Sequence, residues 1–229
     1  MGGLMRYPGG KNSDGVYHKI INLMPPHQVY IEPFLGSGAI LRRKSPAHVN
    51  IGVDKLSLLK DWKENENTKI IQGCGLEFLE NYPFKGNELV YCDPPYLPET
   101  RTNRPLYKND MSETSHKRLL EVIRKLPCMV MVSGYESKLY LTNLKDWSHN
   151  TFKARTSGGR TVIEWLWFNF PEPTELHDYR FLGANLQERQ RIKRKKERWI
   201  KRLKGLPTLE KHAILAAIQE SNTSCHSQK

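Results

Sequence analysis

A carboxylate, two prolines and an aromatic ring follow an apolar run in this chain. The run is Leu89-Val90-Tyr91-Cys92, and the tetrapeptide after it is Asp93-Pro94-Pro95-Tyr96. Proline has a fixed φ and no N–H, so the Asp93 carboxylate and the Pro94 carbonyl can both accept hydrogen bonds from one exocyclic amino group, while Tyr96 can stack on a flat ring. Asp and Pro are also typical of an ordinary strand-ending turn. The tetrapeptide therefore predicts either a grip for a base or a simple turn.

A second pattern, Val29 to Ile40, has the order of a strand, a glycine-bearing turn and the start of a helix. Open α/β sheets bind cofactors at such turns, where glycine lets the backbone approach a ligand. The third glycine of a dinucleotide fingerprint is replaced by Leu41, so a nicotinamide cofactor is not favoured. Asn50 to Val53 predicts another strand, and Asp54 after it can accept hydrogen bonds from a ribose or cap a helix.

Near the N-terminus, the segment Arg6-Tyr7-Pro8-Gly9-Gly10-Lys11 combines cations and a ring with glycines. It can close over a small ligand, or it can be a mobile chain end.

Taken in order, these segments resemble the Dam-type (D12 class) DNA adenine N6-methyltransferases, over most of residues 5 to 170. The resemblance implies a Rossmann-like methyltransferase fold and S-adenosylmethionine as cofactor. It implies catalytic roles for Asp93, Pro94, Pro95 and Tyr96. It also implies cofactor-binding roles for Tyr7, Lys11, Glu32, Phe34, Gly36, Gly38, Asp54 and Asp93. Two later segments, Met129 to Gly134 and Glu164 to Asn169, are similar to the family's following core strands.

Two departures from the family pattern stand out. Cys74 lies where relatives usually carry an acid that contacts the adenine of the cofactor. By the same resemblance, Dam has a large target-recognition insert in the interval that corresponds to Cys74–Asp93. In this chain the interval is too short to hold such an insert. DNA recognition is therefore expected from other segments.

The resemblance implies transfer of a methyl group to adenine N6 in DNA, at a specific site and with the base flipped out of the helix. The same core chemistry also suits an RNA adenine methyltransferase, and a catalytically inactive DNA-binding protein is a third alternative. The loop between Tyr96 and Ser112 offers donors and one ring for contact with the base or its neighbours, namely Arg101, Arg104 and Tyr107.

The formal net charge of the chain is +12, and the cations concentrate near the C-terminus. Residues 187–204 contain ten Lys and Arg residues against Glu188 and Glu197. Ile192, Trp199 and Leu203 recur along one side of a predicted helix there, which leaves the cations on its other sides. The run predicts contact with nucleic acid, or simply a solvated helix face. The residues predicted to meet phosphates are Lys193, Arg194, Lys195, Lys196 and Arg198.

Apolar runs and helical patterns alternate through the first three quarters of the 229-residue chain, which predicts an α/β fold with a mostly parallel sheet. Strands are expected near 29–33, 49–53, 70–72, 89–92 and 128–133, and helices near 14–24, 38–45, 56–66, 113–126 and 136–143. Residues 150–156 and 161–169 predict a C-terminal antiparallel hairpin, with Trp165 and Trp167 packing in the core.

Two domains are expected: a methyltransferase domain over residues 1–172 and a basic helical extension over residues 173–229. In the extension, Thr208 should cap a final helix that runs to about Glu220, with a disordered end from Ser221 to Lys229.

The four cysteines, Cys74, Cys92, Cys128 and Cys225, have no metal-ligand spacing, so reduced thiols and no metal are expected. No signal-peptide pattern or long apolar segment is present in the printed sequence. We therefore expect a soluble, cytoplasmic protein without a membrane partner, associated with the nucleoid or with a phage-infected bacterial cell. The sequence leaves the oligomeric state open.

Overall fold

The computed structural model describes residues 11, 15–56, 66–97, 111–155 and 159–226, with side chains through residue 221. The chain divides into two compact units, unit 1 over Met1–Tyr179 and unit 2 over Arg180–Lys229.

Unit 1 is built around one seven-stranded sheet with the order β3-β2-β1-β4-β5-β7-β6. The strands are β1 (Val29–Glu32), β2 (Val49–Asp54), β3 (Thr68–Gln72), β4 (Glu88–Cys92), β5 (Met129–Gly134), β6 (Ser148–Arg155) and β7 (Thr161–Phe168). The first five strands pair in parallel, and β7 is antiparallel to both β5 and β6. The chain thus starts in the middle of the sheet, builds outward to β3, and then returns to the other side of β1. This arrangement confirms the predicted Rossmann-like methyltransferase fold with a C-terminal antiparallel hairpin.

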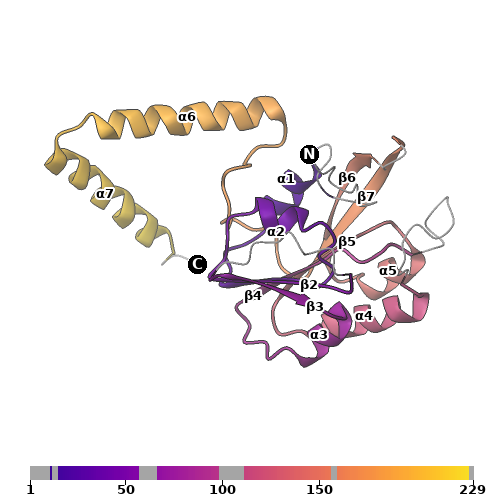
Figure 1. Ribbon diagram of the computed structural model, residues 1–229. Coiled ribbons are helices and arrows are strands. Elements are labelled where there is room, and N and C mark those ends of the chain that lie inside the picture. The colour runs from indigo at the N-terminus through magenta and orange to yellow at the C-terminus, as the bar shows by residue number, and fades with distance from the viewer. Residues whose placement is uncertain (1–10, 12–14, 57–65, 98–110, 156–158, 227–229) are drawn as a thin grey trace, which may run out of the picture. The chain divides into compact units, whose positions relative to one another are not determined.

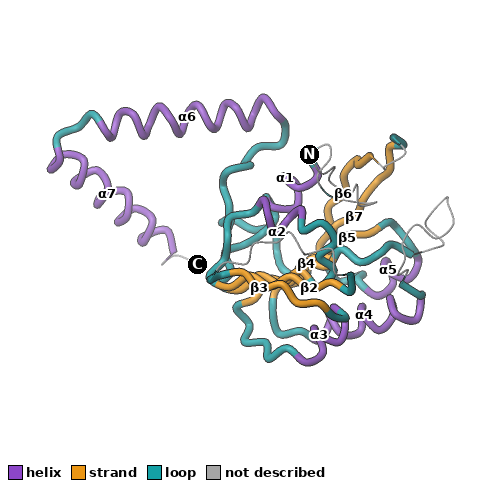
Figure 2. Tube along the Cα trace, in the orientation of Figure 1, coloured by secondary structure: helices purple, strands orange, loops and turns teal. Residues whose placement is uncertain are grey.

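Helices cover both faces of this sheet (Figure 1). One face carries α1 (Val16–Ile21) and α2 (Ala39–Arg43), and the other carries α3 (Gly75–Asn81), α4 (Glu113–Lys125) and α5 (Lys138–Asn143). The alternation of strands and helices along the chain is visible in Figure 2. It places the loops that follow the parallel strands together at one edge of the sheet, the carboxyl edge.

The apolar core lies between the sheet and the layer of α3, α4 and α5. It contains Val90 and Val132 from neighbouring strands, Leu119 and Ile123 from α4, and Trp167 from β7. Trp167 is 1% exposed and its ring stacks against that of Trp165, which confirms the predicted core packing of this pair.

The opposite face of the sheet is more polar. Tyr30 donates a hydrogen bond to Glu32, and the hydroxyls of Tyr91 and Ser133 lie 2.8 Å apart, all four side chains being buried. Side chains alternate between the two faces of a strand, so this polar row includes the residues that reach the carboxyl edge on the side of α1 and α2.

Several element boundaries differ from those predicted. The first helix begins at Val16, after Gly15 with φ 73°, and ends at Ile21, before Pro25 and Pro26. Strand β3 begins at Thr68, two residues early. Helix α3 was not predicted, because a seven-residue helix that starts at glycine gives little periodic signal. The helix predicted at 56–66 falls largely outside the described residues.

Unit 2 consists of two long helices, α6 (Leu186–Lys204) and α7 (Thr208–His226). Asn185 caps α6 by accepting a hydrogen bond from the Glu188 amide at 2.9 Å. The prediction that the chain is disordered from Ser221 is wrong for residues 221–226, which continue α7. No glycine or proline interrupts the helix there, and the Ser221 hydroxyl bonds back to the Ile218 carbonyl.

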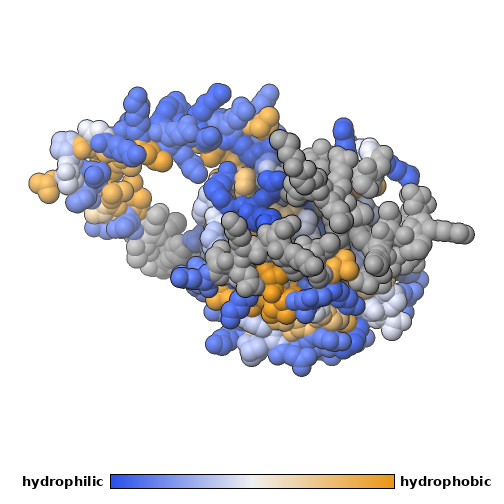
Figure 3. Space-filling view, viewed as in Figure 1, coloured by the Kyte–Doolittle hydropathy of each residue, from blue (hydrophilic) through white to orange (hydrophobic). Residues whose placement is uncertain are grey.

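The surface of α6 is polar along most of its length (Figure 3). No residue of α6 is buried, and Trp199 is 56% exposed within the described structure.

Candidate active site

The residues singled out from the sequence gather at the carboxyl edge of the sheet, where β1 and β4 are neighbours. Glu32 is the last residue of β1 and Asp54 the last of β2, while Asp93 directly follows β4. The strand order reverses between β1 and β4, although the two strands are parallel, so the loops that follow them diverge and leave room for a ligand at this point.

The glycine turn after β1 is held to the end of β2. Gly36 and Gly38 adopt φ values of 50° and 63°, which favour glycine. The Asp54 carboxylate accepts hydrogen bonds from the Gly36 amide at 2.7 Å and from the Leu56 amide at 2.8 Å. Each bond uses a different oxygen, so each oxygen keeps a second lone pair for another donor. Asp54 therefore fixes the shape of the glycine turn and can still accept from a ribose.

The same turn is pressed against the start of α3. A Cβ atom on Gly75 would lie 1.8 Å from the Pro33 carbonyl oxygen, so only glycine fits there. Cys74 caps α3 without a side-chain hydrogen bond and is half-buried. Its thiol thus stands beside the turn, at the place where the family pattern has an acid.

Asp93 is at the centre of a cluster of charged and polar groups. The Lys11 ammonium lies 2.9 Å from Asp93 Oδ1 and also pairs with Glu164. Tyr96 accepts a hydrogen bond from Lys11 and donates a short one, 2.5 Å, to Glu164 Oε1. The Lys11 and Glu164 side chains are each 5% exposed, whereas the Asp93 side chain is 20% exposed. One cation and two carboxylates therefore share a nearly dry site from which Asp93 reaches the surface.

These contacts shift the protonation of the cluster. Burial raises the pKa of Asp93 above its usual value, Lys11 lowers it, and Glu164 raises it, with a net increase. Burial lowers the pKa of Lys11, but Asp93 and Glu164 raise it by more. The net change is an increase, so the ammonium stays charged. Burial and the neighbouring Asp93 raise the pKa of Tyr96 well above 10.0, so its hydroxyl remains a donor.

Glu32 forms a separate buried site beside the glycine turn. Its Oε2 accepts hydrogen bonds from the Tyr30 hydroxyl and the Leu41 amide, both at 3.1 Å. Burial raises the pKa of Glu32 from 4.5 to about 8, with a further increase from Asp93. Phe34, between Glu32 and the glycines, packs partly against the apolar core.

Glu164 was not predicted as a site residue. It is the fourth of the eight residues of β7, one residue before Trp165, which pairs with Gly134 at the end of β5. Because β7 is antiparallel to β5, the first half of β7 lies at the carboxyl edge. An acid within an otherwise apolar strand was the available signal, since such a residue needs a partner when buried.

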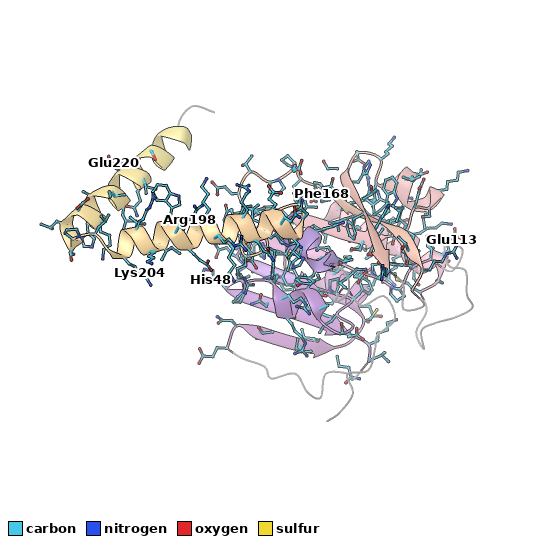
Figure 4. The ribbon with its side chains drawn as sticks, turned by 90° about the horizontal axis from the view of Figure 1, so that it is seen from above. His48, Glu113, Phe168, Arg198, Lys204 and Glu220 are labelled. Atoms are coloured by element: carbon cyan, nitrogen blue, oxygen red, sulfur yellow. The ribbon has the colours of Figure 1, made fainter. Side chains whose placement is uncertain are left out.

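Other predicted residues lie elsewhere. Tyr7, Arg101, Arg104 and Tyr107 fall outside the described residues. The five predicted phosphate contacts are on α6, in unit 2, and are exposed, and Figure 4 labels Arg198 and Lys204 on this helix. Cys92 and Cys128 are buried free thiols, and burial raises the pKa of both.

Residues 43–163 match the family model of the D12 class N6 adenine-specific DNA methyltransferases, which is more than half of the chain. The chain belongs to this family. S-adenosylmethionine is the methyl donor of these enzymes. The acids found at the carboxyl edge suit that cofactor, because Asp54 offers acceptors for a ribose and Glu32 an acceptor for an amino group beside the glycine turn.

No curated protein matches the chain. Among solved structures it is similar to the SMU.1697c protein from Streptococcus mutans in complex with SAH, with 13% identity, a TM-score of 0.37, and coverage of 67% of this chain and 95% of that one. A SAM-dependent methyltransferase from Agrobacterium tumefaciens gives 10% identity, a TM-score of 0.42, and coverage of 67% and 60%. A dimethyladenosine transferase from Plasmodium falciparum gives 13%, 0.46, and coverage of 69% and 62%.

Two kinds of feature are absent from the described residues. None of their helices is long and apolar enough to cross a membrane. No group of three or more His, Cys, Asp or Glu side chains among them could hold a metal ion.

Proposed function

We propose that this protein methylates the N6 amino group of adenine at a specific site in DNA, after flipping the base out of the helix. The observation that carries the proposal is the intact Asp93-Pro94-Pro95-Tyr96 tetrapeptide at the carboxyl edge, in a chain of the D12 class. The hydrogen bonds and ion pair of the Asp93 carboxylate with described residues fall on Oδ1. Oδ2 is therefore the oxygen that can accept a hydrogen bond from a substrate.

The lone pair of adenine N6 is delocalised into the ring, which makes the nitrogen a poor nucleophile. Hydrogen bonds from its two N–H groups to Asp93 Oδ2 and the Pro94 carbonyl would draw it toward a tetrahedral geometry and localise the lone pair. When bound, S-adenosylmethionine would supply an electrophilic methyl group on a sulfonium that can leave as a neutral thioether. The N6 lone pair would then form the new N–C bond, the C–S pair would stay on sulfur, and Asp93 or water would take up the surplus N6 proton.

The protein's own contribution is chiefly positioning and electrostatics. The Tyr96 hydroxyl is hydrogen-bonded to Lys11 and Glu164. The Tyr96 ring packs edge to face against the Tyr135 ring, with 4.5 Å between the ring centroids. This fixes the ring plane against which a flipped base can stack. Flipping costs a few kcal/mol, which stacking and phosphate contacts offset.

The cofactor-binding residues of the proposal are Tyr7, Lys11, Glu32, Phe34, Gly36, Gly38, Asp54 and Asp93. Asp54 supports a ribose, and the two glycines allow close approach of the backbone. Cys74 provides no carboxylate for the adenine amino group, so we expect weaker discrimination of that end of the cofactor than an acid gives.

DNA phosphates are assigned to the cations of α6, because Lys193, Arg194, Lys195, Lys196 and Arg198 are exposed on one helix. Arg101, Arg104 and Tyr107 are proposed to contact the flipped base or its neighbours, since Arg and aromatic side chains suit base edges and base stacks.

Parallel methyl-transfer assays on duplex DNA, single-stranded DNA and RNA test the function. We expect label from S-adenosylmethionine to appear as N6-methyladenine in DNA. A clear preference for RNA would replace the substrate assignment. If the cofactor fails to bind even at millimolar concentration, the chain is a DNA-binding protein and not an enzyme.

Replacing Asp93 tests the mechanism. We expect Asp93→Ala to abolish transfer while the protein still binds the cofactor, because the variant loses the acceptor for N6. Glu88→Gln is the matched control: Glu88 is a buried carboxylate at the start of β4, at the opposite end of this strand. An active Asp93→Ala enzyme would refute the assigned role.

A further inference from the structure

Glu164 is a buried acid of the site, and it belongs neither to the Asp93-Pro94-Pro95-Tyr96 tetrapeptide nor to the glycine turn. It is 4% exposed, and its Oε1 takes both the Lys11 ammonium and the Tyr96 hydroxyl. Lys11 is in turn 2.9 Å from Asp93 Oδ1. Glu164 and Asp93 thus compete for one cation.

Glu164 changes the net charge of the cluster around Asp93. If Asp93 alone faced Lys11, the ammonium would neutralise its carboxylate, and Asp93 would be a weak acceptor for an amino group. With both acids ionised, the cluster of Lys11, Asp93 and Glu164 carries one net negative charge. Methyl transfer moves positive charge from sulfur to N6, so a net negative site stabilises the transition state more than a neutral one.

We propose that Glu164 is a positioning residue for Asp93: it takes up the Lys11 ammonium and the Tyr96 hydroxyl and so leaves Asp93 an electron-rich acceptor for the adenine amine. This inference rests on the proposed function. Glu164 need not touch the substrate. Its role is to prevent Lys11 from neutralising Asp93 and to hold the Tyr96 ring in place.

The charged and titratable groups around Asp93 come from several elements. They are Lys11 before α1, Tyr30 and Glu32 of β1, Tyr91 and Cys92 of β4, Tyr96 of the following loop, Tyr140 of α5 and Glu164 of β7. Of these, Lys11 lowers the pKa of Asp93 and Glu164 raises it. Removal of the Glu164 charge should therefore lower the pKa of Asp93.

The test compares Glu164→Gln with Glu88→Gln, since both replace a buried carboxylate in the same sheet by its neutral isostere. We expect Glu164→Gln to lower kcat by about tenfold to a hundredfold. KM for DNA and the Kd for the cofactor should change less than about threefold, because in this proposal Glu164 touches neither the DNA nor the cofactor. The acid limb of the kcat profile should also move to lower pH, since Asp93 then ionises more easily. Glu88→Gln should leave the limb where it is, and Glu164→Asp should recover part of kcat.

A second measurement does not depend on catalysis. NMR titration of carbon-13 labelled aspartate carboxyls, assigned with Asp93→Asn, reads the pKa of Asp93 in the cofactor-free protein. We expect a lower value in Glu164→Gln than in the wild type, and a wild-type value in Glu88→Gln. An unchanged pKa of Asp93 or an unshifted acid limb would overturn the inference. A wild-type protein that methylates no nucleic acid would instead refute the proposed function, while the titration still tests the coupling.

Discussion

The protonation of Glu32 should make the stability of this protein fall as the pH rises. Glu32 is 3% exposed, and its carboxyl group has two neutral donors, the Tyr30 hydroxyl and the Leu41 amide. Burial raises its pKa from 4.5 to about 8. At neutral pH the folded chain therefore holds a proton on Glu32 that the unfolded chain has released.

The magnitude follows from linkage. The folded state binds more protons than the unfolded state between pH 4.5 and about 8, so the free energy of unfolding decreases with pH in that window. Each unit of pKa shift corresponds to about 1.4 kcal/mol. The contribution is present in full below pH 4.5 and is lost as the pH rises through about 8, for a total of roughly 3–5 kcal/mol.

Urea unfolding of the cofactor-free protein at several pH values, with Glu32→Gln beside the wild type, measures this effect. The glutamine imitates the protonated acid at every pH, and all other titrating groups cancel in the difference between the two proteins. The wild type should lose stability relative to Glu32→Gln by up to about 1.4 kcal/mol per pH unit between about pH 5 and pH 8. A difference that does not vary with pH would show that Glu32 is ionised in the folded state, and the reasoning would fail.

Two further predictions concern the packing of the site and the contact with nucleic acid. Gly75→Ala should destabilise unit 1 by roughly 2–4 kcal/mol in the same unfolding assay, because its Cβ would overlap the Pro33 carbonyl, whereas Gly73→Ala meets no atom within 4 Å and should be nearly neutral. Equal stabilities would mean that the turn after β1 is not pressed against α3. Neutralising Lys193, Arg194, Lys195 and Lys196 together should weaken DNA binding and reduce the slope of log affinity against log salt by up to about 3–4 units. The matched control neutralises four exposed lysines near the amino edge of the sheet, Lys69, Lys85, Lys125 and Lys145, and an equal loss of slope in both variants would remove the special role of α6.

The strands and the acids at the carboxyl edge could be predicted from the sequence, because each strand is a short apolar run and each acid lies at the end of such a run. Apolar runs end at Glu32, Asp54 and Asp93, and the parallel strands β1, β2 and β4 bring these ends to one edge. Glycines with positive φ marked the turn after β1. For such features the signal and the structure lie within the same few residues.

Glu164 and Lys11 show where local patterns stop being informative. Their contact joins the start of the chain to the second strand of a hairpin, and it depends on the antiparallel pairing of β7 with β5. No short segment encodes that pairing. The same holds for Ser45, Asp178 and His177, which join the end of unit 1 to the loop after α2 through the bonds of Asp178 to the Ser45 amide and of His177 to the Ser45 carbonyl.

The acidic site and the basic helix α6 have complementary roles in the proposed function. The carboxyl edge gathers the carboxyl groups of Glu32, Asp54, Asp93 and Glu164, and the buried Lys11 ammonium pairs with the last two. In the proposed reaction, ionised carboxylates there favour the positive charge that develops on N6, but they repel the phosphates of a nucleic acid substrate. We therefore expect the affinity for DNA to come from cations outside this edge, and the chain concentrates ten of them in residues 187–204. If the acids favour the chemistry and α6 supplies the affinity, neutralising α6 should raise KM for DNA with little effect on kcat. Neutralising Glu164 should instead lower kcat with little effect on KM.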